Sequence, residues 1–91
     1  MAEKLVSKLQ VKNKMGLHTR PATSIVKLLQ KVKSDVTFTY KKDTVNAKSI
    51  LSILMLAVPL NGKITVMIEG DDAETAMEMV TTAFNDRFGE K

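Results

Sequence analysis

The sequence predicts a two-layer α+β domain in which three helices cover one face of a single β-sheet. Some segments alternate apolar and polar residues, as half-buried strands do, and others carry apolar residues at helical spacing. In chain order they are strand, helix, strand, strand, helix, strand and helix, a βαββαβα pattern. With 91 residues, 44% of them hydrophobic, we expect one domain over residues 1–91 with a modest core. Other small α+β domains, including ferredoxin-like ones, fit this order nearly as well.

The first half of the chain predicts a strand, a helix and a hairpin. Residues 5–11 alternate and are expected to form a strand. A helix begins just after His18, because apolar residues then recur on one helical face. They are Ala22, Ile25, Val26, Leu29 and Val32. Residues 36–40 alternate again, and a turn at 41–43 leads into a short partner strand over 44–47.

The second half predicts a short apolar helix, a strand and a final helix. The short helix runs from Ser49 to Val58 and is closed by Pro59. After a turn at Asn61-Gly62, residues 64–68 alternate as a strand. The last helix is expected to begin at Asp71-Asp72, with Asp71 and Glu74 as a capping box, and to end at Gly89. Its expected apolar stripe is Ala73, Ala76, Met77, Val80, Ala83, Phe84 and Phe88. Polar residues predict an open sheet face: Lys8, Gln10, Thr37, Thr39, Thr65 and Glu69.

The only histidine, His18, lies in the run Gly16-Leu17-His18-Thr19-Arg20-Pro21-Ala22, at the mouth of the first helix. Pro21 suits the first turn of a helix, and the Thr19 and Arg20 backbone N–H groups there have no intrahelical partner. These donors, the helix dipole and the Arg20 guanidinium can hold a phosphoryl group, and their positive field favours a neutral, nucleophilic ring. A solvated histidine that only caps the helix is the alternative.

The composition excludes several other function classes. The net charge is +4, but the lysines are scattered and the chain has only one tyrosine and three phenylalanines, so a nucleic-acid interface is not expected. Without cysteine there is no disulfide or thiolate site, and one histidine does not make a metal cluster. No apolar stretch approaches the roughly 20 residues of a membrane span. We expect a cytoplasmic monomer without direct membrane insertion.

Two motifs together resemble the HPr phosphocarrier family of the bacterial sugar phosphotransferase system. Residues 16–22 resemble its active-site signature, and Val45-Asn46-Ala47-Lys48-Ser49-Ile50-Leu51 resembles its second signature around a regulatory serine. The resemblance implies an open-faced sandwich with an antiparallel sheet in the order 1-4-2-3. It implies a carrier without a cofactor, and not an enzyme, that accepts a phosphoryl group on His18 from Enzyme I and donates it to Enzyme IIA domains.

The short helix after Ser49 is apolar on all sides, which predicts a docking surface. Ile53, Leu56 and Ala57 can face the sheet. The resemblance implies that partners dock on a patch with Thr23 and Lys27 of the preceding helix nearby; its apolar members are Ile50, Leu51, Leu54 and Met55. Alternatively, neighbouring loops or a dimer cover these side chains.

Ser49 has two interpretations. It occupies the N-cap position of the short helix, and a cap alone explains it. The family resemblance makes Lys48 and Ser49 a site for an HPr kinase/phosphorylase, whose phosphate would add charge and bulk beside the docking patch. Ser52 and Ala57 depart from the family, where many relatives have glycine. Two further hypotheses are a purely regulatory interaction domain of this fold and a carrier of the nitrogen-related branch.

Overall fold

The computed structural model describes residues 2–91, which form a four-stranded antiparallel sheet in the order β1-β4-β2-β3 with helices packed on one face. In chain order the elements are β1 (Glu3–Gln10), α1 (Thr19–Leu29), β2 (Asp35–Tyr40), β3 (Asp43–Asn46), α2 (Ile50–Leu56), β4 (Lys63–Gly70), α3 (Ala73–Asn85) and the 3-10 turn η1 (Arg87–Gly89). The predicted fold class and strand order are therefore confirmed.

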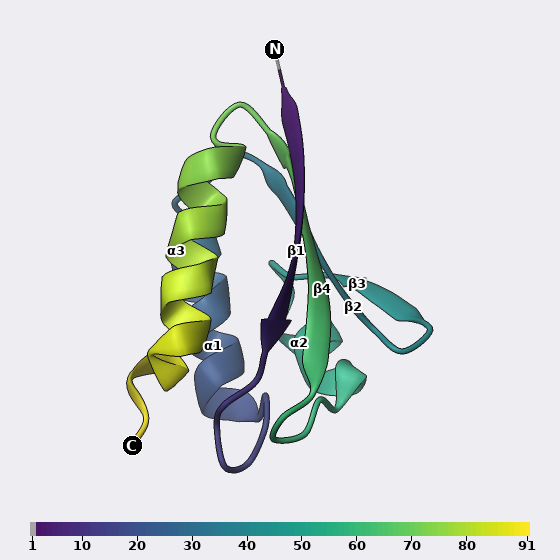
Figure 1. Ribbon diagram of the computed structural model, residues 1–91, viewed down its shortest axis with the longest axis vertical. Coiled ribbons are helices and arrows are strands. Elements are labelled where there is room, and N and C mark those ends of the chain that lie inside the picture. The colour runs from purple at the N-terminus through teal and green to yellow at the C-terminus, as the bar shows by residue number, and fades with distance from the viewer. Residues whose placement is uncertain (1) are drawn as a thin grey trace.

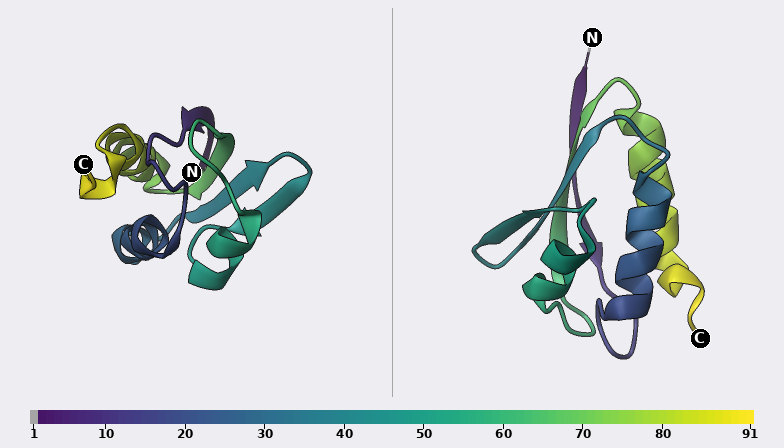
Figure 2. Two further views of the ribbon diagram at one scale, coloured as in Figure 1. Left: turned by 90° about the horizontal axis from the view of Figure 1, so that it is seen from below. Right: turned by 180° about the vertical axis from the view of Figure 1, so that it is seen from behind.

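The core lies between the sheet and the helices. Helices α1 and α3 run side by side, and α2 covers the part of the sheet near β3 (Figures 1 and 2). Register places Phe38 of β2 opposite Val66 of β4, and both side chains are buried. Phe84 of α3 meets the Phe38 ring edge-on at 5.8 Å between centroids. Alternation in the strands and helical spacing in α1 and α3 thus supply the two apolar layers that the sequence predicts.

The opposite face of the sheet is open to solvent along much of its length. The polar side chains expected there are exposed or half-buried, and the hydroxyls of Thr39 and Thr44 lie 2.8 Å apart across the β2–β3 pair. Val6 of β1 is also exposed on this face, where it pairs with Met67 of β4.

Helix α2 is shorter than predicted and ends at Leu56 instead of Val58. Ala57 adopts a left-handed conformation with φ 52°, and its N–H bonds to the carbonyl of Leu54, which closes the helix. Ala57 is consequently exposed, so the prediction that it faces the sheet is wrong, whereas Ile53 and Leu56 are buried as predicted. The next residue, Val58, is buried beyond the helix end.

Both ends of α3 also differ from the prediction. The N-cap is Asp72, not Asp71, and its side chain makes no cap hydrogen bond, so the predicted capping box with Glu74 is wrong. The Asp72 carboxylate instead accepts hydrogen bonds from the backbone N–H groups of Lys33 (2.8 Å) and Ser34 (2.9 Å) and from the Ser34 hydroxyl. It therefore ties the start of α3 to the connection between α1 and β2.

The C-terminal end of α3 lies at Asn85, four residues before the predicted stop at Gly89. Arg87, Phe88 and Gly89 all have positive φ, so the chain turns back in η1. The Phe88 ring packs on Phe84 with 5.0 Å between centroids. Phe88 therefore contributes to the apolar layer from this turn and not from the helix.

Candidate functional site

His18 is the N-cap residue of α1, as the sequence predicts. Its backbone is extended, with φ −78° and ψ −169°, and its carbonyl accepts the first helical hydrogen bond, from Ala22 at 3.0 Å. The imidazole does not cap the helix, and the backbone N–H groups of Thr19 and Arg20 make no hydrogen bond within residues 2–91. The ring is half-buried at a helix end with unpaired donors, which is an anion-binding environment.

The loop before His18 lies tightly against the segment that follows α2. Gly16 has φ 69°, and a Cβ atom there would lie 2.1 Å from the Val58 carbonyl oxygen. Glycine is therefore required for both the conformation and the close approach. The N–H of Leu17 donates to the same carbonyl at 2.9 Å, and the N–H of Asn61 donates to the Val11 carbonyl at 2.8 Å. These bonds fix the position of the histidine relative to α2.

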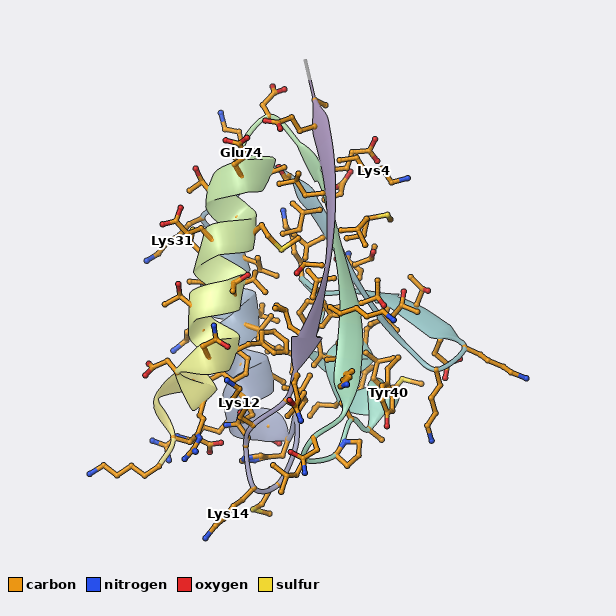
Figure 3. The ribbon with its side chains drawn as sticks, in the orientation of Figure 1. Lys4, Lys12, Lys14, Lys31, Tyr40 and Glu74 are labelled. Carbon is orange, nitrogen blue, oxygen red and sulfur yellow. The ribbon has the colours of Figure 1, made fainter. Side chains whose placement is uncertain are left out.

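His18 borders a hollow of about 580 Å³ that is rich in positive charge. Its cationic lining residues are Lys12, Lys14, Arg20, Arg87 and Lys91. Figure 3 shows Lys12 and Lys14 at the end of the molecule where the chain also terminates. The structure thus brings together His18 and Arg20, as predicted, and adds cations from the β1–α1 loop and from the C-terminal turn. The combined field favours binding of a phosphoryl group.

Glu90 and Asn13 also belong to this site, and the sequence contains no local signal for either. One Glu90 carboxylate oxygen lies 3.2 Å and the other 3.3 Å from His18 Nε2. Asn13 Nδ2 donates to Glu90 Oε1 at 2.5 Å and to the Arg87 carbonyl at 2.9 Å. The hydrogen bond from Asn13 is the main reason that the pKa of Glu90 is lowered; desolvation opposes it, and His18 and Arg20 add to the lowering. Glu90 is therefore a carboxylate at neutral pH.

The apolar side chains of α2 that were predicted to form a docking patch differ in how far they are exposed. Leu51 and Met55 are 68% and 74% exposed, and Ile50 is 38% exposed, whereas Leu54 is only half-buried and packs against the core. The interpretation of Leu54 as projecting freely from the helix is therefore wrong. Helix α2 contacts both α1 and β3, so more of its surface is covered than the side that carries Ile53 and Leu56.

Other members of the predicted patch lie outside the hollow. Thr23 and Lys27 do not line it: the Thr23 hydroxyl donates to the Thr19 carbonyl at 2.8 Å, and Lys27 is an exposed residue of the last turn of α1. Two exposed apolar side chains were not predicted, Met15 before the histidine and Leu60 after α2. The loop that contains Met15 is bonded to the segment that contains Leu60, and Met15 lines the hollow beside His18.

Ser49 is the N-cap of α2, as predicted. Its Oγ accepts a hydrogen bond from the Ser52 N–H at 3.3 Å, and the side chain is half-buried. The neighbouring Lys48 does not extend into solvent, because its Nζ donates to the Val32 carbonyl at 3.0 Å. The structural role of Ser49 as a cap is present, and a regulatory role is a separate hypothesis.

Within residues 2–91, no group of three histidine, aspartate or glutamate side chains is placed to hold a metal ion. None of the helices described above has the length and apolar character needed to cross a membrane.

Comparison with known proteins identifies the family. A family model described as "PTS HPr component phosphorylation site" matches residues 6–86. The chain belongs to the HPr family. It is similar to the phosphocarrier protein HPr of Chlamydia muridarum (strain MoPn / Nigg), with 48% identity over 80 residues that cover 88% of this chain and 77% of the relative. It is 40% identical to HPr of Xylella fastidiosa (strain Temecula1 / ATCC 700964), over 94% and 97% of the two chains.

The solved structures agree with this assignment. The crystal structure of HPr-C-His from Thermoanaerobacter tengcongensis superimposes with a TM-score of 0.91 at 34% identity, covering 96% of this chain and 98% of the other. Membership in the HPr family identifies the chain as a phosphocarrier of the phosphotransferase system, as the resemblance of the two motifs predicts. The match to the family model ends at residue 86, so Glu90 lies beyond it.

Proposed function

We propose that His18 is the phosphoryl acceptor, that Enzyme I is the donor, and that Enzyme IIA domains receive the group in turn. The observation that carries this proposal is the placement of a half-buried imidazole at the unpaired N-terminus of α1, beside a hollow lined by cations. The Thr19 N–H and the Arg20 guanidinium are the groups that bind phosphoryl oxygens. We infer that transfer takes place in the cytoplasm.

The chemistry needs a nucleophile and compensation of charge. A ring nitrogen with a free lone pair attacks phosphorus, and the bond from phosphorus to the donor breaks, leaving its electron pair on the donor. The transferred phosphoryl group carries negative charge, and the backbone donors and the Arg20 guanidinium stabilise that charge. After this step phosphorus is bonded to the ring nitrogen, so the protein acts as a covalent carrier until an acceptor takes the group.

Docking is assigned to the exposed apolar surface beside the site. Ile50, Leu51 and Met55 supply it, and Leu54 on the same helix is half-buried against the core. Thr23 and Lys27 of α1 form its polar edge in this proposal. Positive charge around the hollow would speed encounter with acidic surfaces of Enzyme I and Enzyme IIA, in a salt-dependent way.

Regulation through Ser49 is a separate part of the proposal. A phosphate added by an HPr kinase/phosphorylase would lie at the start of α2, directly before Ile50 and Leu51. The two negative charges would then oppose docking without requiring a change of fold.

The decisive experiment is incubation with Enzyme I and labelled phosphoenolpyruvate. We expect acid-labile label on the unaltered protein and none on His18→Ala, with both proteins folded by circular dichroism. Undiminished acid-labile labelling of His18→Ala would contradict the assignment of this residue. A regulatory domain that works without phosphoryl transfer would bind partners but take no label on His18, so the same experiment separates that alternative.

A further inference from the structure

Two methionine side chains are exposed near His18 and on the docking helix. Met15, in the loop before α1, is 75% exposed and lines the hollow beside His18. Met55, on α2, is 74% exposed. The loop before α1 and the segment after α2 lie side by side at one end of the molecule (Figure 1), and the Leu17 N–H bonds to the Val58 carbonyl between them. The two thioethers thus come from segments that are bonded to each other.

The other methionines that the structure describes are less accessible. Met67 of β4 is half-buried, and so are Met77 and Met79 of α3, which pack against the core. The chain contains no cysteine, so it has no thiol to react with a peroxide. Sulfur oxidation therefore falls on methionine, and their exposure places Met15 and Met55 ahead of the other three.

We propose that Met15 and Met55 are sites of reversible oxidation by hydrogen peroxide, and that their sulfoxides weaken docking of Enzyme I. A lone pair on sulfur forms a bond to one peroxide oxygen, and the O–O bond breaks. The second oxygen leaves with that electron pair and takes up the proton of the first, which gives water and a sulfoxide. Methionine sulfoxide reductases reverse the change with a thiol reductant: the oxygen leaves as water and the thiols become a disulfide.

This inference rests on the proposed function, because the sulfoxides act on docking. A thioether is apolar, whereas a sulfoxide oxygen is a hydrogen-bond acceptor that water solvates. A partner that covers Met55 would remove this oxygen from water without a matching donor, which opposes association. At Met15 the same polar group would lie beside the ring that the partner must reach. Both side chains are exposed, so their oxidation leaves the core intact.

Peptide mapping by mass spectrometry tests the selectivity. The unaltered protein is treated with hydrogen peroxide for increasing times, and catalase then removes the oxidant. We expect sulfoxide to form several times faster at Met15 and Met55 than at Met67, Met77 and Met79, with an unchanged circular dichroism spectrum. Equal rates at these five methionines would overturn the selectivity of the two sites.

The effect on docking is measured in the labelling reaction with Enzyme I. After oxidation the unaltered protein should need about tenfold more protein for half-maximal transfer, and treatment with the two sulfoxide reductases should restore its first value. The double variant Met15→Leu, Met55→Leu keeps apolar side chains of similar volume without sulfur. Compared with its own value before peroxide, it should lose nothing on oxidation.

A matched variant completes the design. Met77→Leu removes a half-buried sulfur of α3 outside the hollow, so peroxide should impair this variant as strongly as the unaltered protein. The proposal is overturned if oxidation impairs the double variant equally, or if the sulfoxides at Met15 and Met55 leave transfer to the unaltered protein unchanged. Absence of label before any oxidation would instead count against the proposed function, whereas the peptide map needs no Enzyme I.

Discussion

Truncation to alanine should strongly lower the stability of the protein at one residue of α2 and hardly change it at another residue two positions away. Ile53 is 0% exposed in the core, whereas Leu51, two residues earlier on the same helix, is 68% exposed. Ile53→Ala removes buried methyl groups and should lower the free energy of unfolding by about 2–5 kcal/mol. Leu51→Ala should change it by no more than about 0.5 kcal/mol. For a domain of this size 1 kcal/mol corresponds to about 4–8 °C in Tm.

The thermal assay therefore separates the two variants. Ile53→Ala should melt at least about 8 °C below the unaltered protein, and Leu51→Ala within about 4 °C of it. In the labelling reaction, Leu51→Ala should need about fivefold more protein for half-maximal transfer from Enzyme I, the equivalent of about 1 kcal/mol at a docking contact. A large fall in Tm for Leu51→Ala would refute its exposure, and unchanged transfer would refute its role in docking. Leu54 is unsuitable for this test because it also packs on the core.

Three further predictions concern charge and capping. Arg20→Lys should slow phosphoryl transfer by roughly tenfold to a hundredfold, since the lysine point charge does not replace the bidentate arginine fork. Lys27→Ala should cause a smaller, salt-sensitive loss of transfer rate. Equal transfer rates for Arg20→Lys and the unaltered protein would exclude Arg20 from the phosphoryl site. Phosphorylation of Ser49 should slow labelling of His18 with little change in circular dichroism, and Ser49→Asp should slow it only partly. Unchanged labelling kinetics would leave Ser49 as a helix cap alone. Loss of that cap in Ser49→Ala should lower the free energy of unfolding by about 1 kcal/mol. The pKa of Asp72 is lowered from 3.8 to about 2 by hydrogen bonds from the Ser34 side chain and the Lys33 backbone. Its stabilising contribution is therefore present above pH 3.8 and is lost as the pH falls through about 2, so the urea midpoint of Asp72→Asn should lie below that of the unaltered protein at pH 7 and converge with it near pH 2.

Features that depend on neighbouring residues were predictable from the sequence. Strand alternation determined which side of the sheet Phe38 and Val66 face, and Pro21 marked the first turn of α1, which placed His18 at its N-cap. Ser49 was likewise recognisable as a cap from its position before an apolar run.

Features that depend on distant parts of the chain were not predictable in this way. The N-cap of α3 is Asp72, and its carboxylate bonds to residues 38 and 39 positions away instead of capping the helix, which no local pattern around Asp71 and Asp72 indicates. Glu90 reaches His18 across 72 positions, through a turn whose positive φ values at Arg87 and Phe88 have no signature in those residue types. Ala57 ends α2 in a conformation that glycine usually adopts, so its sequence pointed to a longer helix.

The bonded contact between the loop of Gly16 and the segment after α2 determines where the chain tolerates added residues. An insertion between Val11 and His18 would strain the hydrogen bonds to Val58, Asn61 and Gly62, and would displace His18 relative to α2. The turn at Lys41 and Lys42 joins only β2 and β3 and is exposed, so a short insertion there leaves both undisturbed. That hairpin is therefore the position for an epitope or a fluorescent label. Among members of the family, the length of the chain should vary least in the loop before the histidine.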